Sequence, residues 1–67
     1  MIVCYRGNFW VIEIKVAHSG KDAKKKAEEA YCQIINNNYA TPYPNAFCLG
    51  LSIDDSLRQI TAFKIND

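Results

Sequence analysis

Apolar residues in this chain gather into four short runs whose patterns predict β-strands, because the side chains of a strand point to opposite faces in turn. The first two runs cover residues 2–5 and 9–16, and the last, at 59–65, alternates polar with apolar residues. The run at 46–53 is nearly continuous, as expected for an inner strand covered on both faces. Gly50 within it indicates the close approach of another backbone.

One amphipathic helix is predicted between the second and third strands. Its apolar residues follow helical spacing and are Ala23, Ala27, Ala30, Tyr31, Ile34 and Ile35. Ser19 and Asp22 have the spacing of a capping box, so we expect the helix to begin near Gly20 or Lys21. The asparagines at 36–38 are expected to end it, since asparagine tolerates the left-handed cap conformation.

The element order β-β-α-β-β restricts the topology. Strand, helix and strand form a right-handed crossover unit, which makes the second and third strands parallel. A tight turn with positive φ angles expected at Gly7 and Asn8 attaches the first strand as an antiparallel hairpin, and the last strand pairs with the third in the same way. We therefore predict one α/β domain over residues 1–67, with a mixed four-stranded sheet and one helix on one face.

Composition adds limits on the class of protein. The chain has 67 residues, 49% of them hydrophobic, and a formal net charge of +1. A domain this small is marginally stable without a staple or a partner, and the near-zero charge does not favour nucleic-acid binding over the whole surface. No apolar run approaches the roughly 20 residues of a membrane span, and the first residues lack a signal-peptide pattern. We expect a cytoplasmic protein with no membrane contact.

The number and spacing of the cysteines indicate whether the protein works in an oxidising or a reducing compartment. Cys4, Cys32 and Cys48 are odd in number and widely spaced, which fits neither a disulfide framework nor a zinc site with paired ligands. We expect buried, reduced thiols that serve packing.

Glu13 and Lys15 interrupt the second apolar run. They share one face of the predicted strand, while Ile12, Ile14 and Val16 share the other. Two interpretations are open: the charged pair lies on the solvated face of a sheet, or it belongs to an active site. In the second case, the carboxylate holds Mg²⁺ and the ammonium stabilises charge during phosphodiester hydrolysis. Mg²⁺ also requires further oxygen ligands, and the first strand contains no acidic residue.

Several motifs taken together resemble a known family. They are the run 11–16 with its E-x-K, the helix segment 30–34, the Tyr39 to Tyr43 loop, the glycine-containing strand 49–53 and the run 60–63. In this order they resemble the C-terminal part of a PD-(D/E)xK nuclease-superfamily domain, from the branch found C-terminal to AAA-ATPase-like domains in bacterial proteins. The resemblance implies a restriction-endonuclease-like core that covers almost the whole chain.

The resemblance assigns roles to individual residues. Glu13 corresponds to a metal carboxylate, Ile14 contributes its backbone carbonyl to the metal, and Lys15 corresponds to the catalytic lysine. Gln33 matches a helix glutamine that borders the site, although a solvated residue at the edge of the apolar stripe has the same pattern. Tyr39 matches a tyrosine after the helix, and an aromatic plug for the loop is the other interpretation.

One departure from the family changes the functional expectation. The family's second metal ligand is an aspartate on the preceding strand, and Met1 stands at the matching position. The resemblance therefore implies a domain truncated on its N-terminal side, with low affinity for Mg²⁺ and weak or absent hydrolysis of DNA or RNA. The alternative is a non-catalytic interaction module that forms homo-oligomers through an exposed sheet edge.

Two other features have weaker patterns. Lys21, Lys24, Lys25 and Lys26 form a basic run that is typical of a solvated helix face and is also the one candidate patch for a polyanion. His18 follows the strand of Glu13 and is either incidental or a general base.

Overall fold

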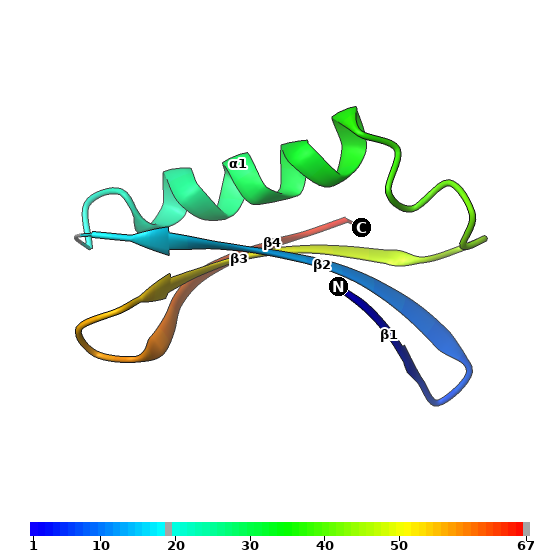
Figure 1. The fold of residues 1–67 in the computed structure, drawn as a ribbon, viewed down its shortest axis with the longest axis horizontal. Helices are drawn as coiled ribbons and strands as arrows, with labels where there is room; N and C mark the ends of the chain where they lie inside the picture. The colour runs from blue at the N-terminus through cyan, green and yellow to red at the C-terminus, as the bar shows by residue number, and fades with distance from the viewer. Residues whose placement is uncertain (19, 67) are drawn as a thin grey trace.

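The computed structural model describes residues 1–18 and 20–66, and it shows a four-stranded sheet with one helix on one face (Figure 1). The elements are β1 (Ile2–Tyr5), β2 (Asn8–Ala17), α1 (Ala23–Asn36), β3 (Phe47–Asp54) and β4 (Gln59–Ile65). The strands lie in the order β1-β2-β3-β4, with β2 and β3 parallel and the two outer pairs antiparallel. The predicted β-β-α-β-β order and mixed sheet are confirmed.

Helix α1 begins at Ala23, two to three residues after the start predicted near Gly20 or Lys21. Asp22 is the N-terminal cap residue, and its backbone carbonyl accepts a hydrogen bond from the Lys26 amide at 2.9 Å. The Ser19 half of the predicted capping box lies outside the described residues. At the other end Asn38 has a φ of 56°, the left-handed conformation expected there. In the described part of the chain, no helix has the length and apolar character needed to cross a membrane.

The turn between β1 and β2 differs in detail from the prediction. Arg6 and Gly7 have φ angles of 51° and 79°, whereas Asn8 is already the first residue of β2 and pairs with Tyr5. A two-residue hairpin of this kind needs positive φ at both central positions. Gly7 has the positive φ that was predicted, and the second residue with a positive φ is Arg6 rather than Asn8.

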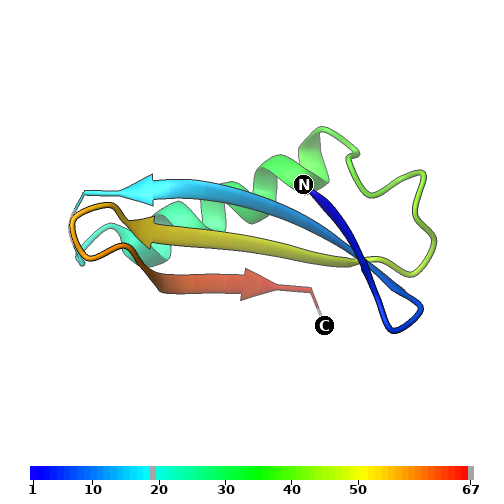
Figure 2. The same ribbon diagram turned by 60° about the horizontal axis from the view of Figure 1, so that its bottom comes forward.

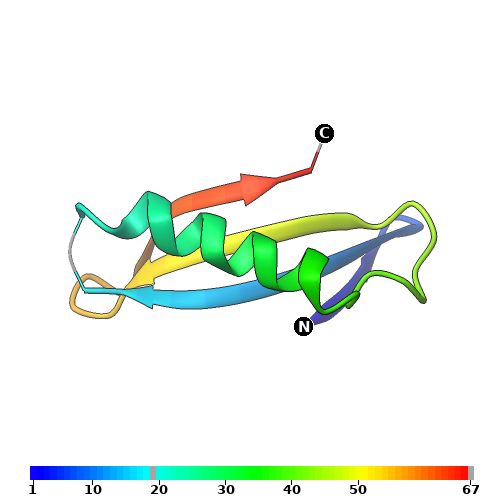
Figure 3. The same ribbon diagram turned by 90° about the horizontal axis from the view of Figure 1, so that it is seen from above.

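Gly50 fixes how the helix lies on the sheet. A Cβ atom at this position would overlap backbone atoms of Ala27 and Tyr31, so the helix backbone lies directly on β3. This close approach confirms the prediction for Gly50. Seen from above in Figure 3, the helix crosses diagonally over the middle of the sheet.

The space between helix and sheet is filled by small side chains for the most part. The buried residues are Val11, Ala17, Ala23, Ala27, Ala30, Ile34, Cys48, Gly50 and Ser52. Ser52 is fully buried, and its hydroxyl lies 3.1 Å from that of Thr61, with which it forms a hydrogen bond. The buried core is accordingly thin, and most of the large apolar side chains lie elsewhere.

Those large side chains lie on the other face of the sheet, which we call the open face. Neighbouring residues in register point to the same side of a sheet, so the positions that alternate with Val11, Cys48, Gly50 and Ser52 point away from the helix. The open face consists of Val3, Tyr5, Trp10, Ile12, Ile14, Val16, Phe47, Leu49, Leu51, Ile53, Ile60, Phe63 and Ile65. None of these residues is classed as buried. Figure 2 brings this side forward: the helix lies behind the sheet, and β1 crosses in front of β2 near the turn that joins them.

The prediction that β3 is covered on both faces is therefore wrong. β3 is an inner strand of the sheet, but only its helix-facing residues are buried, and Phe47 on the open face is 36% exposed. The continuous apolar run reflects two different surroundings. One side packs under the helix, and the other belongs to the open face.

The cysteines also depart from expectation. Cys48 is buried, whereas Cys4 and Cys32 are exposed, and all three are free. Cys4 lies on the edge strand β1. Cys32 lies about 200° around the helix from the buried Ala30, since successive residues are about 100° apart. Burial raises the pKa of the Cys48 thiol above its usual value of 9.0.

We predict that Gly50→Ala destabilises the fold, because the added methyl group has no space beneath the helix backbone. The expected loss is about 1–3 kcal/mol in the free energy of unfolding, typical of overpacking, measured by urea denaturation. Gly20→Ala is the matched control, since nothing lies within 4 Å of a Cβ there. Equal stability of the two variants would contradict the close helix contact.

Thiol labelling tests the cysteine assignment. In the native protein Cys4 and Cys32 should react quickly with a thiol reagent, and Cys48 only after unfolding, as read by mass spectrometry. Because the folded state raises the pKa of Cys48, stability should fall as the pH rises above 9.0 and through the folded-state pKa. Cys48→Ala should lose this part of the alkaline decline, and rapid native labelling of Cys48 would contradict its burial.

Candidate functional site

Glu13 and Lys15 lie on the face of the sheet that the helix covers. In the parallel pairing of β2 with β3, Glu13 is beside Gly50 and Lys15 is beside Ser52. Both charged residues are half-buried. Ile14 and Val16 point to the open face and are 41% and 40% exposed. The pair therefore lies on the helix side of the sheet and stays partly exposed, and the apolar side of β2 is the one that the helix does not cover.

A cleft of about 490 Å³ opens beside Glu13. It is lined by Met1, Ile2, Val11, Glu13, Asn38, Tyr39, Pro42 and Tyr43. These residues come from the start of the chain, from β2 and from the loop that follows the helix. The volume lies within the usual range of small-molecule sites, about 300–1,000 Å³. The fold thus brings together Glu13 and Tyr39, which the sequence singled out separately.

The loop that forms one wall of the cleft is held by Tyr43 rather than by Tyr39. The ring of Tyr43 packs against that of Phe9 with their centroids 5.2 Å apart. Tyr39 is 41% exposed, and its hydroxyl accepts a hydrogen bond from the Asn37 side-chain amide at 3.0 Å. An aromatic plug for the loop was one of the two interpretations of Tyr39. The ring contact that holds the loop is made by Tyr43, and Tyr39 lines the cleft.

The backbone carbonyl of Ile14 points away from β3. The Ile12 amide and carbonyl bond to Met1 on the β1 side, both at 2.8 Å. Backbone groups two residues apart on a strand point to the same side, so those of Ile14 point past Met1, where the described chain has no strand. This side of β2 is therefore an open edge from Ile14 onward.

Gln33 occupies the flank of the helix that lies toward β2. Tyr31 marks the other flank, because the Lys64 ammonium on β4 lies 5.9 Å from the centre of its ring. Gln33 is about 200° from Tyr31 around the helix axis, and its side chain is partly buried. Gln33 thus lies on the flank of the helix nearer to Glu13 and Lys15, although it does not line the cleft beside Glu13.

The residues around Glu13 do not fit the magnesium site that the family resemblance implies. Mg²⁺ takes six oxygen ligands and is usually held by one or two carboxylates together with substrate phosphates. Among the residues that the structure describes, Glu13 is the sole acidic one lining the cleft. Over residues 1–18 and 20–66, no group of three or more His, Cys, Asp and Glu residues could hold a metal ion. A single carboxylate with the Ile14 carbonyl is too few ligands.

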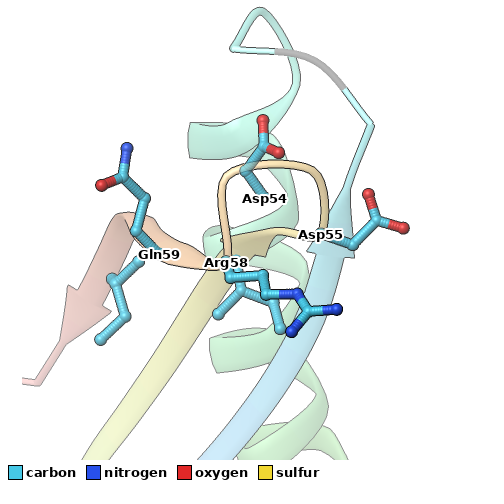
Figure 4. Close-up of a pocket in the computed structure, with 6 residues that line it drawn as sticks. Asp54, Asp55, Arg58 and Gln59 are labelled. Atoms are coloured by element: carbon cyan, nitrogen blue, oxygen red, sulfur yellow. The ribbon is translucent and has the colours of Figure 1, made fainter.

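A second cleft, of about 540 Å³, lies at the hairpin between β3 and β4 (Figure 4). The carboxylate of Asp54 accepts hydrogen bonds from the Ser56 and Leu57 amides at 2.8 and 2.9 Å, so its role is to form the turn. The labelled side chains in Figure 4 fan outward and do not converge on a common point. This hairpin cleft therefore offers no assembled set of ligands.

The remaining candidates lie apart from the Glu13 cleft. His18 is exposed at the end of β2. Lys24 and Lys25 are exposed on the helix, and Lys26 forms an ion pair with Glu29 at 3.4 Å. These lysines have the arrangement of a solvated helix face, and none of them lines either cleft.

Comparisons with protein-family models, curated proteins and solved structures gave no match to this chain. The resemblance to PD-(D/E)xK nucleases therefore stays a prediction.

Proposed function

We propose that this chain is a non-catalytic interaction module whose sheet binds another protein surface. The observation that supports this proposal is the open face, which is apolar over all four strands and contains no charged residue. Isolated exposed apolar residues are common on protein surfaces, but a large contiguous patch of them is typical of an interaction site. Several of these side chains are largely exposed, including Tyr5 at 59%, Ile60 at 60% and Phe63 at 66%.

The exposed sheet edges expected from the sequence offer a second means of association. Strands β1 and β4 are the outer strands, and β2 is unpaired on one side from Ile14 onward. Unpaired strand edges present rows of backbone donors and acceptors that pair with other chains. Homo-oligomerisation through an edge is thus a form of the same proposed function. The free cysteines support the further proposal that the protein works in the reducing cytoplasm.

A nuclease-like role is the second candidate, and it is favoured by one arrangement. Glu13 and Lys15 share a face, Gln33 borders it from the helix, and Glu13 lines the cleft. These positions agree with a PD-(D/E)xK-like core that retains half of its site and whose ancestral substrate was DNA or RNA. Because the donor set does not suit Mg²⁺, we propose that the chain by itself does not hydrolyse phosphodiester bonds.

Site-specific photo-crosslinking in cells tests the interaction module. A photoreactive phenylalanine analogue at Phe63 on the open face should give a discrete cross-linked adduct. The same analogue at Ile35, which is 48% exposed on the helix, is the control and should give none. Absence of any adduct at Phe63, or equal adducts at both positions, would overturn the proposal.

A nuclease assay tests the catalytic expectation. Incubation of the chain with plasmid DNA or RNA and Mg²⁺ or Mn²⁺ should give no cleavage above that of Lys15→Ala or Glu13→Gln. Cleavage by the unaltered chain that both variants lose would show that the half-site is active. That result would make the nuclease the better proposal.

A further inference from the structure

The open face carries apolar side chains from one side of the sheet to the other. Val3 on β1 and Phe63 on β4 lie near opposite margins, and Ile12 and Leu51 lie between them on the inner strands. Asn8, next to the β1–β2 turn, is the sole exception among the strand residues that point this way. Apolar side chains therefore extend across the whole width of the open face.

The helix-covered face has a different pattern. Its centre is small and apolar under the helix, but Glu13, Lys15 and Lys64 lie to the sides of Gly50 and Ser52. A face covered by a single helix therefore keeps charged residues where the helix does not reach. The strand residues of the open face include no charged side chain, and the charged residues Asp55 and Arg58 lie at its hairpin end, where they line a cleft with Ile53 and Ile60.

The width of the open face argues against a helix as its occupant. A helix is about 10 Å across with its side chains. Three to four strands about 4.8 Å apart make a surface roughly 15 to 19 Å wide. One helix would leave the outer strands uncovered, whereas a second sheet would cover all of them at the usual face-to-face spacing of about 10 Å.

We propose that the occupant is a second copy of this chain, with the two open faces stacked and the two helices outside. The inference rests on the proposed interaction function and names its partner. In a twofold dimer the same patch meets itself, so any charged residue near its centre would meet a like charge. The open face has no charge and is therefore compatible with itself.

The flat area of the open face is smaller than the area that a standard interface takes from each partner, so a stable contact has to use all of it. The eight residues of β3 span roughly 26 Å at about 3.3 Å per residue, and with a width of roughly 15 to 19 Å the flat area is roughly 400–500 Å². Protruding side chains make the accessible area larger, and a standard interface takes about 800 Å² from each partner. Only full coverage brings the interface toward that value.

The thin core gives a second reason for a partner. Many of the buried apolar residues are alanines, each of which buries little area: Ala17, Ala23, Ala27 and Ala30. Burial of apolar area is the main favourable term in folding. Stacking two open faces would bury the aromatic and branched side chains that one chain leaves in water.

Oligomeric mass is the direct test. Analytical ultracentrifugation from micromolar to millimolar concentration should show a dimer for the unaltered chain. Phe63→Lys and Ile60→Lys should weaken dimerisation about tenfold or more by placing a charge in the interface. Their side chains are 66% and 60% exposed within one chain, so circular dichroism should show both variants folded. Ile35→Lys, on the helix, is the control and should remain dimeric.

Tryptophan fluorescence distinguishes a dimer that forms through the open face from one that forms through the sheet edges. Trp10 is the single tryptophan of the chain and stacks on Phe47 within the open face, with their rings 4.6 Å apart. Dilution through the dimer–monomer transition should shift Trp10 emission to longer wavelength as water reaches the indole. A dimer that dissociates with no shift, or that persists in both lysine variants, would place the contact at an edge and overturn face-to-face stacking.

The cross-link at Phe63 distinguishes failure of this inference from failure of the proposed function. An adduct with twice the 7.6 kDa mass of the chain supports both. A monomer in solution whose adduct contains a different, identified protein overturns the second-copy inference and leaves the interaction module in place. A monomer that forms no adduct overturns both.

Discussion

The direct contact between the helix backbone and Gly50 determines the rest of the structure. Because no Cβ fits at this position, the helix lies closer to β3 than ordinary side chains allow, and alanines fill most of the remaining space. A layer this thin has no room for bulky residues. The large apolar side chains of β2, β3 and β4 therefore lie on the other side of the sheet, where the single helix cannot cover them.

The same contact explains why the candidate site is half-buried. The helix crosses the middle of the sheet, and its flanks leave space for Glu13 and Lys15 on the covered face. The loop after the helix then forms the wall of the cleft beside Glu13, held by the packing of Tyr43 on Phe9. A charged pair on the covered face is costly unless solvent or a partner reaches it, and the open cleft supplies that access for Glu13.

The two candidate functions use opposite sides of one sheet and are compatible in space. The cleft beside Glu13 lies on the helix side, whereas the proposed contact lies on the open face. A chain that stacks through its open face would keep Glu13 and the cleft beside it away from the interface, whereas the hairpin cleft includes Ile53 and Ile60 of the open face. Association would thus stabilise the domain without closing the half-site, and the unpaired Ile14 carbonyl at the β2 edge would be free for another strand.

The sequence by itself determined the elements and their connections, because strand and helix periodicity, turn residues and crossover handedness are local or topological properties. It also identified Gly50 as a close contact. Only the tertiary structure decided which side of β2 is covered, since strict alternation in Glu13 and Ile14 defines two faces but does not say which one the helix takes. The continuous run of β3 similarly did not reveal that one of its faces has no cover. The exposure of Cys4 and Cys32 also depends on how the helix and its loop pack across the sheet. The same packing places Glu13 and Tyr39 in the lining of one cleft, and no local sequence pattern encodes it.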